Sequence, residues 1–528
     1  MSMNRRYVMG MLSGAGSVVL RSALNVLVVP VLIAKLGLDV FGLYIVLLAI
    51  LEVATFLDLG ATSAIVTQLS GEHEEKERRS ILKVAHVWFG VLALLFLIVS
   101  VLGRGQFCPL FHIAPALQTV VLTSFVFMAI ESTLAIYSCY CRSVLLAHCA
   151  HQWTNIADSV SNLCVTVGSL MILLSGGGLI EIMMLRLAAA LFRLGLMTFQ
   201  TIRMEPFALR PQVPFNLMSL WEMARLTGHS MMINVSIIIS HKMDDLVIAH
   251  FLPLSAVGIY EIVFRFLGIT VQIGLKLCEG IYPVFAKLAT SRQVSEARQI
   301  FLRKSAFLNI VSTLILVIIV SFYPELFALF SAGKIPIQNT LPVLAVALPC
   351  VWSGVLQMPA NAWLFTWGHQ RFVSVTSFSA ALVNLALSVI LVQHWGIVGV
   401  AIGTLVPQLI QHQLGLIRKS CQELGIGTLE YIGAVHGKAI VPLLATGLFI
   451  LLCRPILPHA LFLLPTIGII AMIAGLLGAF LWFQFSATSQ EKEMLYPLLK
   501  KVLPFKLSLP IQRQNPRFSP NTEPDQAS

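Results

Sequence analysis

One stretch of this chain occurs twice: LGLDVFGLY at Leu36–Tyr44 returns 216 residues later as LPLSAVGIY at Leu252–Tyr260. Two leucines, a glycine and a tyrosine recur in register, and each copy lies between two long apolar segments. A repeat spacing of this size exceeds the period of any solenoid, so it predicts duplication of a whole multi-helix unit.

The composition predicts a protein that crosses a membrane many times. Hydrophobic residues make up 57% of the 528 positions and charged residues only 11%, whereas about a quarter of the residues of a soluble domain carry charge. A membrane-spanning helix needs roughly 20 mainly apolar residues. The apolar segments divide into about fourteen such helices, placed near residues 8–33, 41–68, 84–103, 117–141, 155–175, 180–202, 222–250, 255–285, 305–330, 338–366, 372–393, 397–417, 436–453 and 461–485.

The distribution of basic residues predicts the orientation of these helices. Most of the 35 Lys and Arg residues lie on one side of the predicted map, and the other side has only Lys35, Arg104, Lys334 and Arg454. Because cytoplasmic loops carry the excess of Lys and Arg, we expect both termini to be cytoplasmic. This bias and the attraction of anionic lipid headgroups account for the net charge of +11 without nucleic-acid binding.

The repeat predicts an all-α membrane protein with two parallel six-helix repeats and two further C-terminal helices. Ser175–Gly178 and Gln393–Gly396, both tight turns before a helix, are offset by nearly the same distance as the opening stretch. After the second turn, the small residues Gly399 and Gly403 predict close helix contact. The expected organisation is an N-terminal six-helix lobe (1–203), a cytoplasmic linker (204–217), a C-terminal six-helix lobe (218–418), helices 13 and 14 (436–485), and a largely disordered cytoplasmic tail (486–528).

Charged residues inside the predicted spans are the strongest functional candidates, because a charge at the bilayer centre costs about 2.5–3.5 kcal/mol on insertion scales. They concentrate in predicted helices 1, 2, 7 and 8, the equivalent pairs of the two repeats. These residues are Arg21, Glu52, Asp58, Lys242, Asp244, Asp245, Glu261, Arg265, Lys276 and Glu279. They would face one another across a central cavity, where transporters of this design hold substrate.

Basic residues in these spans are candidates for substrate binding: Arg21, Arg186, Lys242, Arg265 and Lys276. Arg21 has no acidic residue within one helical turn, so it needs a partner from another helix or an anionic ligand. Arg186 lies seven residues before Arg193 on one helix face, and guanidinium groups match phosphate oxygens bidentately. Both arginines could instead snorkel toward an interface.

Local ion pairs are an alternative for several of these charges. The spacing allows Glu261 to pair with Arg265, Lys276 with Glu279, and Lys242 with Asp245.

Four acidic residues are candidates for ion coupling: Asp58, Asp244, Asp245 and Glu279. Asp58 has no Lys or Arg within four residues, and a lone carboxylate within a membrane suits the transport of a proton or a cation. The alternative is an aspartate that packs helices through hydrogen bonds.

Enzymatic motifs are absent from the sequence. It contains no P-loop, no HExxH and no His/Cys cluster with metal-ligand spacing. We therefore expect no catalytic residues, no metal site and no cofactor, and we expect any energy input to come from an ion gradient, the membrane potential or the substrate gradient.

Several short segments carry a resemblance to a known family. Leu36–Tyr44, Leu57–Gly60 (LDLG), Met243–Ile248 (MDDLVI), Val257–Tyr260 (VGIY) and Ile281–Phe285 (IYPVF) resemble the bacterial polysaccharide-flippase family of the multidrug/oligosaccharidyl-lipid/polysaccharide exporter superfamily. The resemblance covers roughly residues 8–420. It implies two six-helix lobes around a cavity, and alternating access.

The implied activity is movement of an isoprenoid-diphosphate-linked oligosaccharide across the cell inner membrane for surface polysaccharides such as the O-antigen of lipopolysaccharide. The diphosphate would be drawn to Arg21, Lys242, Arg265 and Lys276. The implied partners are this lipid-linked oligosaccharide, membrane lipids, a polysaccharide polymerase and glycosyltransferases.

Three alternatives remain open from the sequence. The last two helices resemble fourteen-helix members that include lipid II flippases. An ion-coupled exporter of amphipathic cations would need a predominantly acidic cavity. A membrane scaffold for glycan-assembly enzymes would leave the cavity charges dispensable.

Overall fold

A computed structural model describes residues 28–56, 58, 60–71, 75–209, 231–278, 281–331, 333–456 and 463–481. The described residues form helices and no strand, so the expected all-α class is confirmed. Nine of their helical stretches are long and apolar enough to cross a membrane. The count of fourteen stays a prediction, because most of the first predicted span, most of the predicted linker and all of the predicted tail lie outside the described residues.

The N-terminal part begins with a helix at residues 28–36. It continues with α2 (Leu38–Phe56), α3 (Ala61–Leu69), α4 (Glu75–Leu110), α5 (Gln118–Ala147), α6 (His151–Leu174) and α7 (Leu179–Met204). Helix α4 begins well before the predicted span at residue 84. Its charged first turns stay helical because Glu75 and Glu77 lie at the positive end of the helix dipole and Glu75 pairs with Arg79 one turn later. Hydropathy therefore located the apolar part of this helix and missed its charged start.

The C-terminal part begins with helical residues 231–241. It continues with α9 (Met243–Phe251), α10 (Leu254–Cys278), α11 (Ile281–Ser291), α12 (Val294–Ser321), α13 (Tyr323–Phe330), α14 (Leu341–Leu356), α15 (Met358–Thr366), α16 (Gln370–Leu409), the π-helix η3 (Ile410–Ile417), α17 (Arg418–Glu423), α18 (Thr428–Val435), α19 (Ile440–Cys453) and α20 (Leu463–Leu481). The predicted span at 255–285 corresponds to α10 followed by the start of α11.

The predicted span at 41–68 is not one helix. Helix α2 ends at Phe56, and α3 starts after Gly60, whose φ of 81° is left-handed. Asp58 lies in the break, where its Oδ1 accepts a hydrogen bond from the Gly60 backbone N–H at 3.0 Å. The expectation that Asp58 sits deep inside a helix is therefore wrong, because glycine permits the break and the aspartate stabilises it.

The predicted turn at Gln393–Gly396 is confirmed. Gly396 has a φ of 57° inside α16, so the chain reverses there and the two arms of α16 pack antiparallel. A Cβ added at Gly399 would lie 2.2 Å from the Leu391 carbonyl oxygen, and one added at Gly403 would lie 2.6 Å from Ser388 Oγ. The small residues are thus what allows the arms to approach closely.

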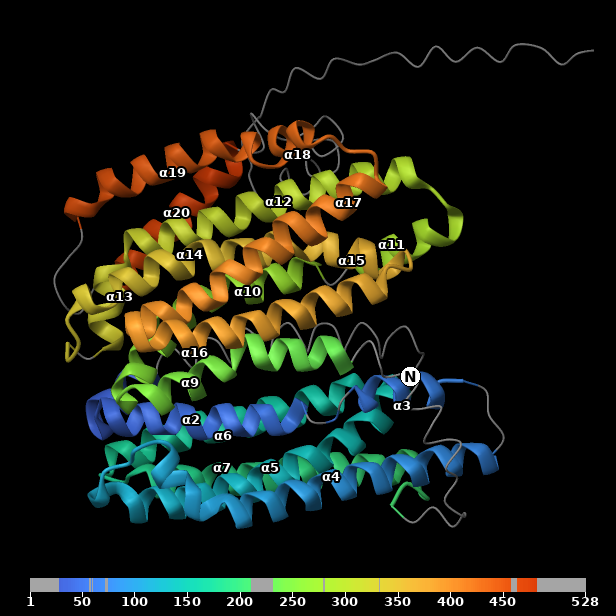
Figure 1. Ribbon diagram of the computed structural model, residues 1–528, viewed down its shortest axis with the longest axis vertical. Coiled ribbons are helices and arrows are strands. Elements are labelled where there is room, and N and C mark those ends of the chain that lie inside the picture. The colour runs from blue at the N-terminus through green and yellow to red at the C-terminus, as the bar shows by residue number, and fades with distance from the viewer. Residues whose placement is uncertain are drawn as a thin grey trace, which may run out of the picture.

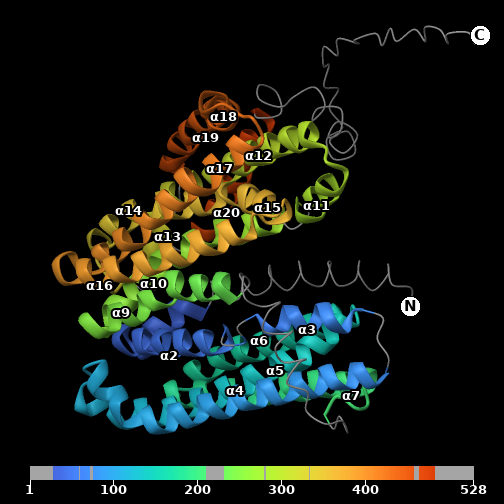
Figure 2. The ribbon, with the colours of Figure 1, turned by 45° about the vertical axis from the view of Figure 1, so that its right-hand side comes forward.

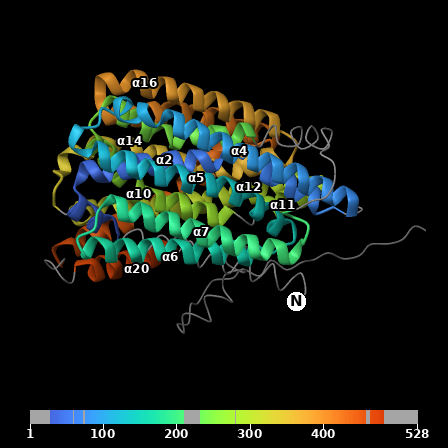
Figure 3. The ribbon, with the colours of Figure 1, turned by 90° about the horizontal axis from the view of Figure 1, so that it is seen from below.

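The helices gather into two groups, shown in Figure 1. Helices α2–α7 form the lower group, which we call the N-lobe (28–209), and the helices from α9 onward form the upper group, the C-lobe (231–481). Helices α19 and α20 pack against α12 on the part of the C-lobe that faces away from the N-lobe. The long helices run roughly parallel when seen from below (Figure 3).

Within the described ranges, the lobes share an apolar core at one end only. We call the end with the turns at Gly37 and Gly396 the Gly37 side, and the end with the turns at Ser70 and Gly368 the Ser70 side. One apolar cluster on the Gly37 side includes buried residues of both lobes, such as Phe41 and Val257. On the Ser70 side each lobe has a separate cluster. Figure 2 shows the lobes meeting at α2, α9 and α10.

Polar links between the lobes also lie on the Gly37 side. Lys334 Nζ donates hydrogen bonds to the carbonyl oxygens of Ile33 and Ala34, at 3.0 and 2.8 Å. These are terminal carbonyls of the 28–36 helix, which a cation stabilises. His250 Nδ1 lies 2.8 Å from the Leu110 carbonyl oxygen. Among the described residues, no hydrogen bond or ion pair joins the lobes at the Ser70 end.

The two copies of the repeated stretch contact each other. A Cβ added at Gly42 would lie 1.9 Å from the Leu254 carbonyl oxygen. In return, a Cβ added at Gly258 would lie 3.0 Å from side-chain carbons of Leu38 and Phe41. The repeat equates Gly42 with Gly258 and Leu38 with Leu254, so this contact is reciprocal, as expected at a two-fold axis. The pseudo-two-fold axis therefore passes between α2 and α10.

We expect Gly42→Ala to destabilise the fold more than Gly258→Ala. The methyl group at Gly42 meets backbone, which has to move, whereas the one at Gly258 meets side-chain carbons that can shift. Overpacking of this kind costs about 1–3 kcal/mol. Thermal unfolding of the purified variants in detergent measures the difference.

The matched control is Gly90→Ala in α4, where nothing lies within 4 Å of an added Cβ. It should be neutral or slightly stabilising, because alanine is the better helix former. Equal melting temperatures for the three variants would contradict the close interlobe contact.

Candidate functional site

Charged side chains of both lobes meet where α2 faces α9 and α10. We call Glu52, Lys242, Asp245, Glu261 and Arg265 the interlobe cluster. Lys242 Nζ lies 2.5 Å from Glu52 Oε2, and this ion pair joins the two lobes. Arg265 donates from Nε and Nη2 to Glu261 Oε1, at 3.0 and 2.5 Å. The cluster is thus built from two ion pairs, one between the lobes and one within α10.

The ion-paired side chains of the cluster are accessible although they lie on interior helices. Exposed fractions are 39% for Glu52, 29% for Lys242, 27% for Arg265 and 21% for Glu261. Helices of both lobes surround them, so these side chains are partly accessible at the interface between the lobes. An ionic ligand at this interface can reach them.

Local pairing was predicted correctly for one residue pair and not for another. Glu261 and Arg265 pair at i,i+4 as the spacing allows. Lys242 pairs with Glu52 instead of Asp245, because Lys242 lies at the junction where the 231–241 helix ends and α9 begins. Asp245 is buried in α9, within electrostatic reach of Glu261, Lys242 and Glu52.

The balance of charge in this cluster differs from the cationic cavity expected from the sequence. Its three carboxylates outnumber its two cations among the described residues. Lys276 is exposed and lies about three turns farther along α10 than Arg265. Arg21 and Glu279, the other charges expected at the cavity, lie outside the described residues.

A second site surrounds Asp244 inside the C-lobe. Tyr260 and Thr404 each donate a hydroxyl hydrogen bond to Asp244 Oδ2 at 2.8 Å. Ser388 Oγ donates to Oδ1 at 3.4 Å. The carboxylate is 3% exposed, and hydroxyl groups hold it where an ion pair would be usual for a buried charge. The two arms of α16 and helix α10 thus converge on one buried carboxylate.

Asn384 adds unsatisfied polar atoms to the same arm of α16. It is buried, one helical turn before Ser388 and on the same face. Neither its amide nitrogen nor its amide oxygen has a hydrogen-bond partner among the described residues. Buried polar atoms without partners indicate room for a water or an ion. The Asp244 site is therefore rich in oxygen ligands and poor in positive charge.

A third site joins α5, α7 and α2 inside the N-lobe. Arg186 donates from Nε and Nη2 to the two carboxylate oxygens of Glu131, at 3.1 and 2.8 Å. Its Nη1 lies 3.5 Å from the hydroxyl oxygen of Tyr44. The side chains of Arg186 and Glu131 are 14% and 6% exposed. Arg186 is therefore held in a buried bidentate pair within the N-lobe.

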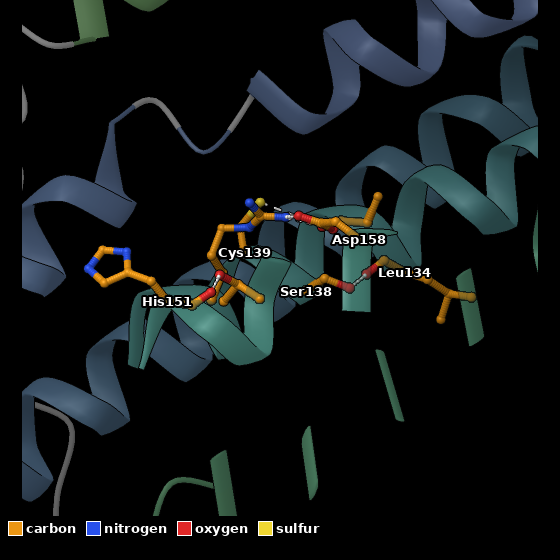
Figure 4. Close-up of polar contacts among 8 residues, drawn as sticks. Leu134, Ser138, Cys139, His151 and Asp158 are labelled. Carbon is orange, nitrogen blue, oxygen red and sulfur yellow. Dashed lines mark hydrogen bonds and ion pairs between the residues drawn. The ribbon is translucent and has the colours of Figure 1, made fainter. Parts of the chain in front are cut away.

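The N-lobe has another group of charges nearer the Ser70 side. Arg142 on α5 donates to both oxygens of Asp158 on α6, at 3.1 and 2.9 Å. Figure 4 shows Asp158 pointing toward the α5 segment that carries Ser138 and Cys139. Arg193 and Asp58 lie within electrostatic reach of Cys139. Asp58 and Arg193 therefore lie near the Arg142–Asp158 pair and are not part of the interlobe cluster.

Tyr44, Tyr260, Asn384, Ser388 and Thr404 are polar residues that sequence reasoning did not select. The two tyrosines had a signal, since they are the last residues of the repeated stretch. The hydroxyl and amide residues of α16 had none, because Ser, Thr and Asn are common in membrane helices as packing residues.

The chain matches two families. The family described as "Polysaccharide biosynthesis protein" matches residues 8–289, and the family MatE matches residues 230–390. No curated protein matches the sequence.

Solved structures share the fold. The inward closed conformation of the lipid II flippase MurJ has a TM-score of 0.67 and 15% identity, over 90% of this chain and 99% of that one. The inward-facing conformation of a MATE family multidrug resistance transporter has a TM-score of 0.63 and 13% identity, over 77% of this chain and 94% of that one. A multidrug/oligosaccharidyl-lipid/polysaccharide superfamily transporter from Pyrococcus furiosus has a TM-score of 0.52 and 14% identity, over 80% and 96% of the two chains.

At these identities the solved structures establish the fold. The match to the family described as "Polysaccharide biosynthesis protein" spans more than half of the chain and establishes family membership. This protein therefore belongs to the polysaccharide biosynthesis protein family within the multidrug/oligosaccharidyl-lipid/polysaccharide exporter superfamily, whose members are membrane transporters and not enzymes.

Proposed function

We propose that this protein flips an isoprenoid-diphosphate-linked oligosaccharide across the cell inner membrane, for assembly of a surface polysaccharide such as O-antigen. Family membership supports this substrate class. Glycosyltransferases would build the substrate and a polymerase would consume it. A lipid II flippase is the alternative that carries the same diphosphate.

The observation that carries the proposal is the position of the interlobe cluster. Its ion-paired residues are accessible between two lobes that share an apolar core on the Gly37 side and have separate cores on the Ser70 side. Alternating access needs such a pair of lobes around a central site. We propose that the two lobes move as rigid bodies, with the bounds 1–203 and 218–418 and the linker 204–217 expected from the sequence.

The orientation follows from the basic residues. The excess of Lys and Arg supports a cytoplasmic Ser70 side with both termini cytoplasmic. In this orientation the structure is closed toward the outside, and the site would load from the cytoplasmic leaflet.

We propose that the diphosphate binds by exchanging ionic partners. Lys242 and Arg265 are paired with Glu52 and Glu261 in this structure. A diphosphate carries more charge than one carboxylate and accepts the bidentate donors of a guanidinium. Transfer of Lys242 from Glu52 to the diphosphate would break an ion pair between the lobes, and so would couple substrate binding to their movement.

Export of amphipathic cations is a second candidate. The excess of carboxylates in the interlobe cluster favours it, as does the MatE match over residues 230–390. The two candidates differ in which sign of charge the substrate needs.

We further propose that the Asp244 site couples transport to a monovalent cation. A carboxylate, three hydroxyl groups and an amide with unused polar atoms form an oxygen-rich set, and hard cations prefer oxygen ligands. Asp58 is a weaker candidate because it makes a turn hydrogen bond, and Asp245 is weaker because it belongs to the charged cluster. Glu279 lies outside the described residues and stays a candidate from the sequence.

We expect Arg265→Gln and Lys242→Gln to reduce glycan export by at least about tenfold, because each loss removes a charge-assisted contact to the diphosphate, about 1.5–3 kcal/mol. Surface polysaccharide of cells that produce each variant measures export, and membrane fractions measure insertion. Arg21→Ala is expected to behave alike.

The matched control is Arg454→Gln, which removes an arginine paired with Glu325 on the Gly37 side, away from the cluster. It should keep normal export. If the Lys242 and Arg265 variants keep normal surface polysaccharide, while Glu52→Gln and Glu261→Gln lose efflux of a cationic dye, the cation exporter replaces the flippase.

We expect a monovalent cation to raise the melting temperature of the purified protein. Binding to the folded state at ten times Kd adds about 1.4 kcal/mol of stability. Melting in sodium, potassium or lithium chloride, compared with choline chloride, measures this effect. Asp244→Asn should abolish it, and Thr313→Val, which removes a hydroxyl of α12, should keep it. The same melting temperature in all four salts would refute the coupling site.

A further inference from the structure

The two lobes place polar residues at equivalent positions of the repeat. The opening stretch equates Tyr44 with Tyr260. Counted from the turn glycines Gly178 and Gly396, Arg186 and Thr404 are each the eighth residue of the following helix. The same two positions meet in both lobes: Arg186 contacts the Tyr44 hydroxyl, and Thr404 and Tyr260 both donate to Asp244. The N-lobe and C-lobe sites are therefore counterparts.

The counterparts differ in where their positive charge comes from. In the N-lobe, the buried carboxylate of Glu131 is neutralised by Arg186, a cation fixed to the chain. In the C-lobe, the buried carboxylate of Asp244 has hydroxyl donors and no ion pair with a described residue. The counterpart of the arginine is a threonine, which carries no charge and donates a hydrogen bond to Asp244.

The acids also come from different helices. The repeat equates Asp244 with Val28, a buried residue of the 28–36 helix. The N-lobe carboxylate comes from α5 instead, through Glu131. Each lobe thus keeps one buried carboxylate beside the repeated tyrosine, although its place in the sequence has changed.

We propose that Arg186 is a tethered cation: its guanidinium occupies in the N-lobe the place that a mobile monovalent cation takes at Asp244 in the C-lobe. Arg186 is accordingly a positioning residue, which neutralises Glu131 and holds Tyr44, and it does not bind substrate. Tyr44 lies within electrostatic reach of Arg265. By holding Tyr44, the tethered cation therefore fixes the position of one neighbour of the interlobe cluster. The part of this inference that concerns Asp244 rests on the proposed ion coupling, and the part that concerns Arg186 rests on its contacts alone.

This assignment changes the role that the sequence suggests for Arg186. A substrate ligand needs to be accessible, whereas the Arg186 and Glu131 side chains are 14% and 6% exposed. Removing one member of a buried ion pair leaves an uncompensated charge, but removing both can be nearly neutral. The two roles therefore predict opposite results for a double substitution.

The experiment compares Arg186→Lys, Arg186→Met, Glu131→Gln and the double variant Arg186→Met with Glu131→Gln, by surface polysaccharide and by melting of the purified proteins. We expect Arg186→Met to lose about tenfold in export, because Glu131 stays buried without a partner. The lysine variant should keep most activity, and the double variant should recover to within about threefold of the unchanged protein.

The control is Arg298→Met, which removes an arginine from an exposed ion pair with Glu430 in the other lobe and should have little effect. A double variant no more active than Arg186→Met, or a lysine variant as inactive as Arg186→Met, would overturn the tethered cation and favour direct substrate contact.

A separate variant tests the correspondence between the lobes. Thr404→Arg places a tethered cation at Asp244, so it should abolish the salt-dependent melting shift, whereas Arg186→Lys should keep that shift. If the unchanged protein shows no shift, the ion coupling fails and the Arg186 result still stands. If the shift exists and Thr404→Arg keeps it, the equivalence of the two sites is wrong.

Discussion

The structure depends on one contact between helices, the reciprocal approach of α2 and α10 at their glycines. Gly42 lets the Leu254 carbonyl oxygen approach, and Gly258 receives side-chain carbons of Leu38 and Phe41. Since a helix rises 1.5 Å per residue, this contact also sets which residues face each other farther along. It brings Glu52 to Lys242 and holds Tyr44 and Tyr260 near the same interface. The placement of the accessible charges therefore depends on Gly42 and Gly258, which have no side chain to keep the helices apart.

The sequence predicted the features that depend on local pattern. The all-α membrane class, the turn at Gly396, the close glycine packing after it and the Glu261–Arg265 pair needed only hydropathy, turn chemistry and helical spacing. The repeated stretch, which predicted duplication, lies where the lobes meet. It did not reveal that its two copies contact each other, because that depends on how two distant units pack.

The partners of the buried charges could not be predicted from spacing. Asp245 follows Lys242 by three residues in the sequence, yet Lys242 pairs across the interface with Glu52. Arg186 has no acid near it in the sequence after Glu181 and finds Glu131 on another helix. Asp58 looked like a lone buried carboxylate and is a turn residue, because Gly60 breaks the helix. In each case a contact between helices, distant in the sequence, decides the role of the residue.

The shared apolar cluster on the Gly37 side has an energetic consequence for any second conformation. Separating the lobes there would uncover side chains such as Phe41 and Val257, each fully buried, and each costs about 1.5–3 kcal/mol to expose. A two-state equilibrium moves from 1:99 to 99:1 with about 5.5 kcal/mol, so a few such side chains are enough to hold the protein in one state. The opposite conformation can be populated only if the Ser70 ends bury a comparable apolar area as they close. Which conformation this protein rests in therefore depends on the difference in free energy between two hydrophobic contacts, one at each end of the molecule. The charged residues between them need to supply only the small free energy that remains.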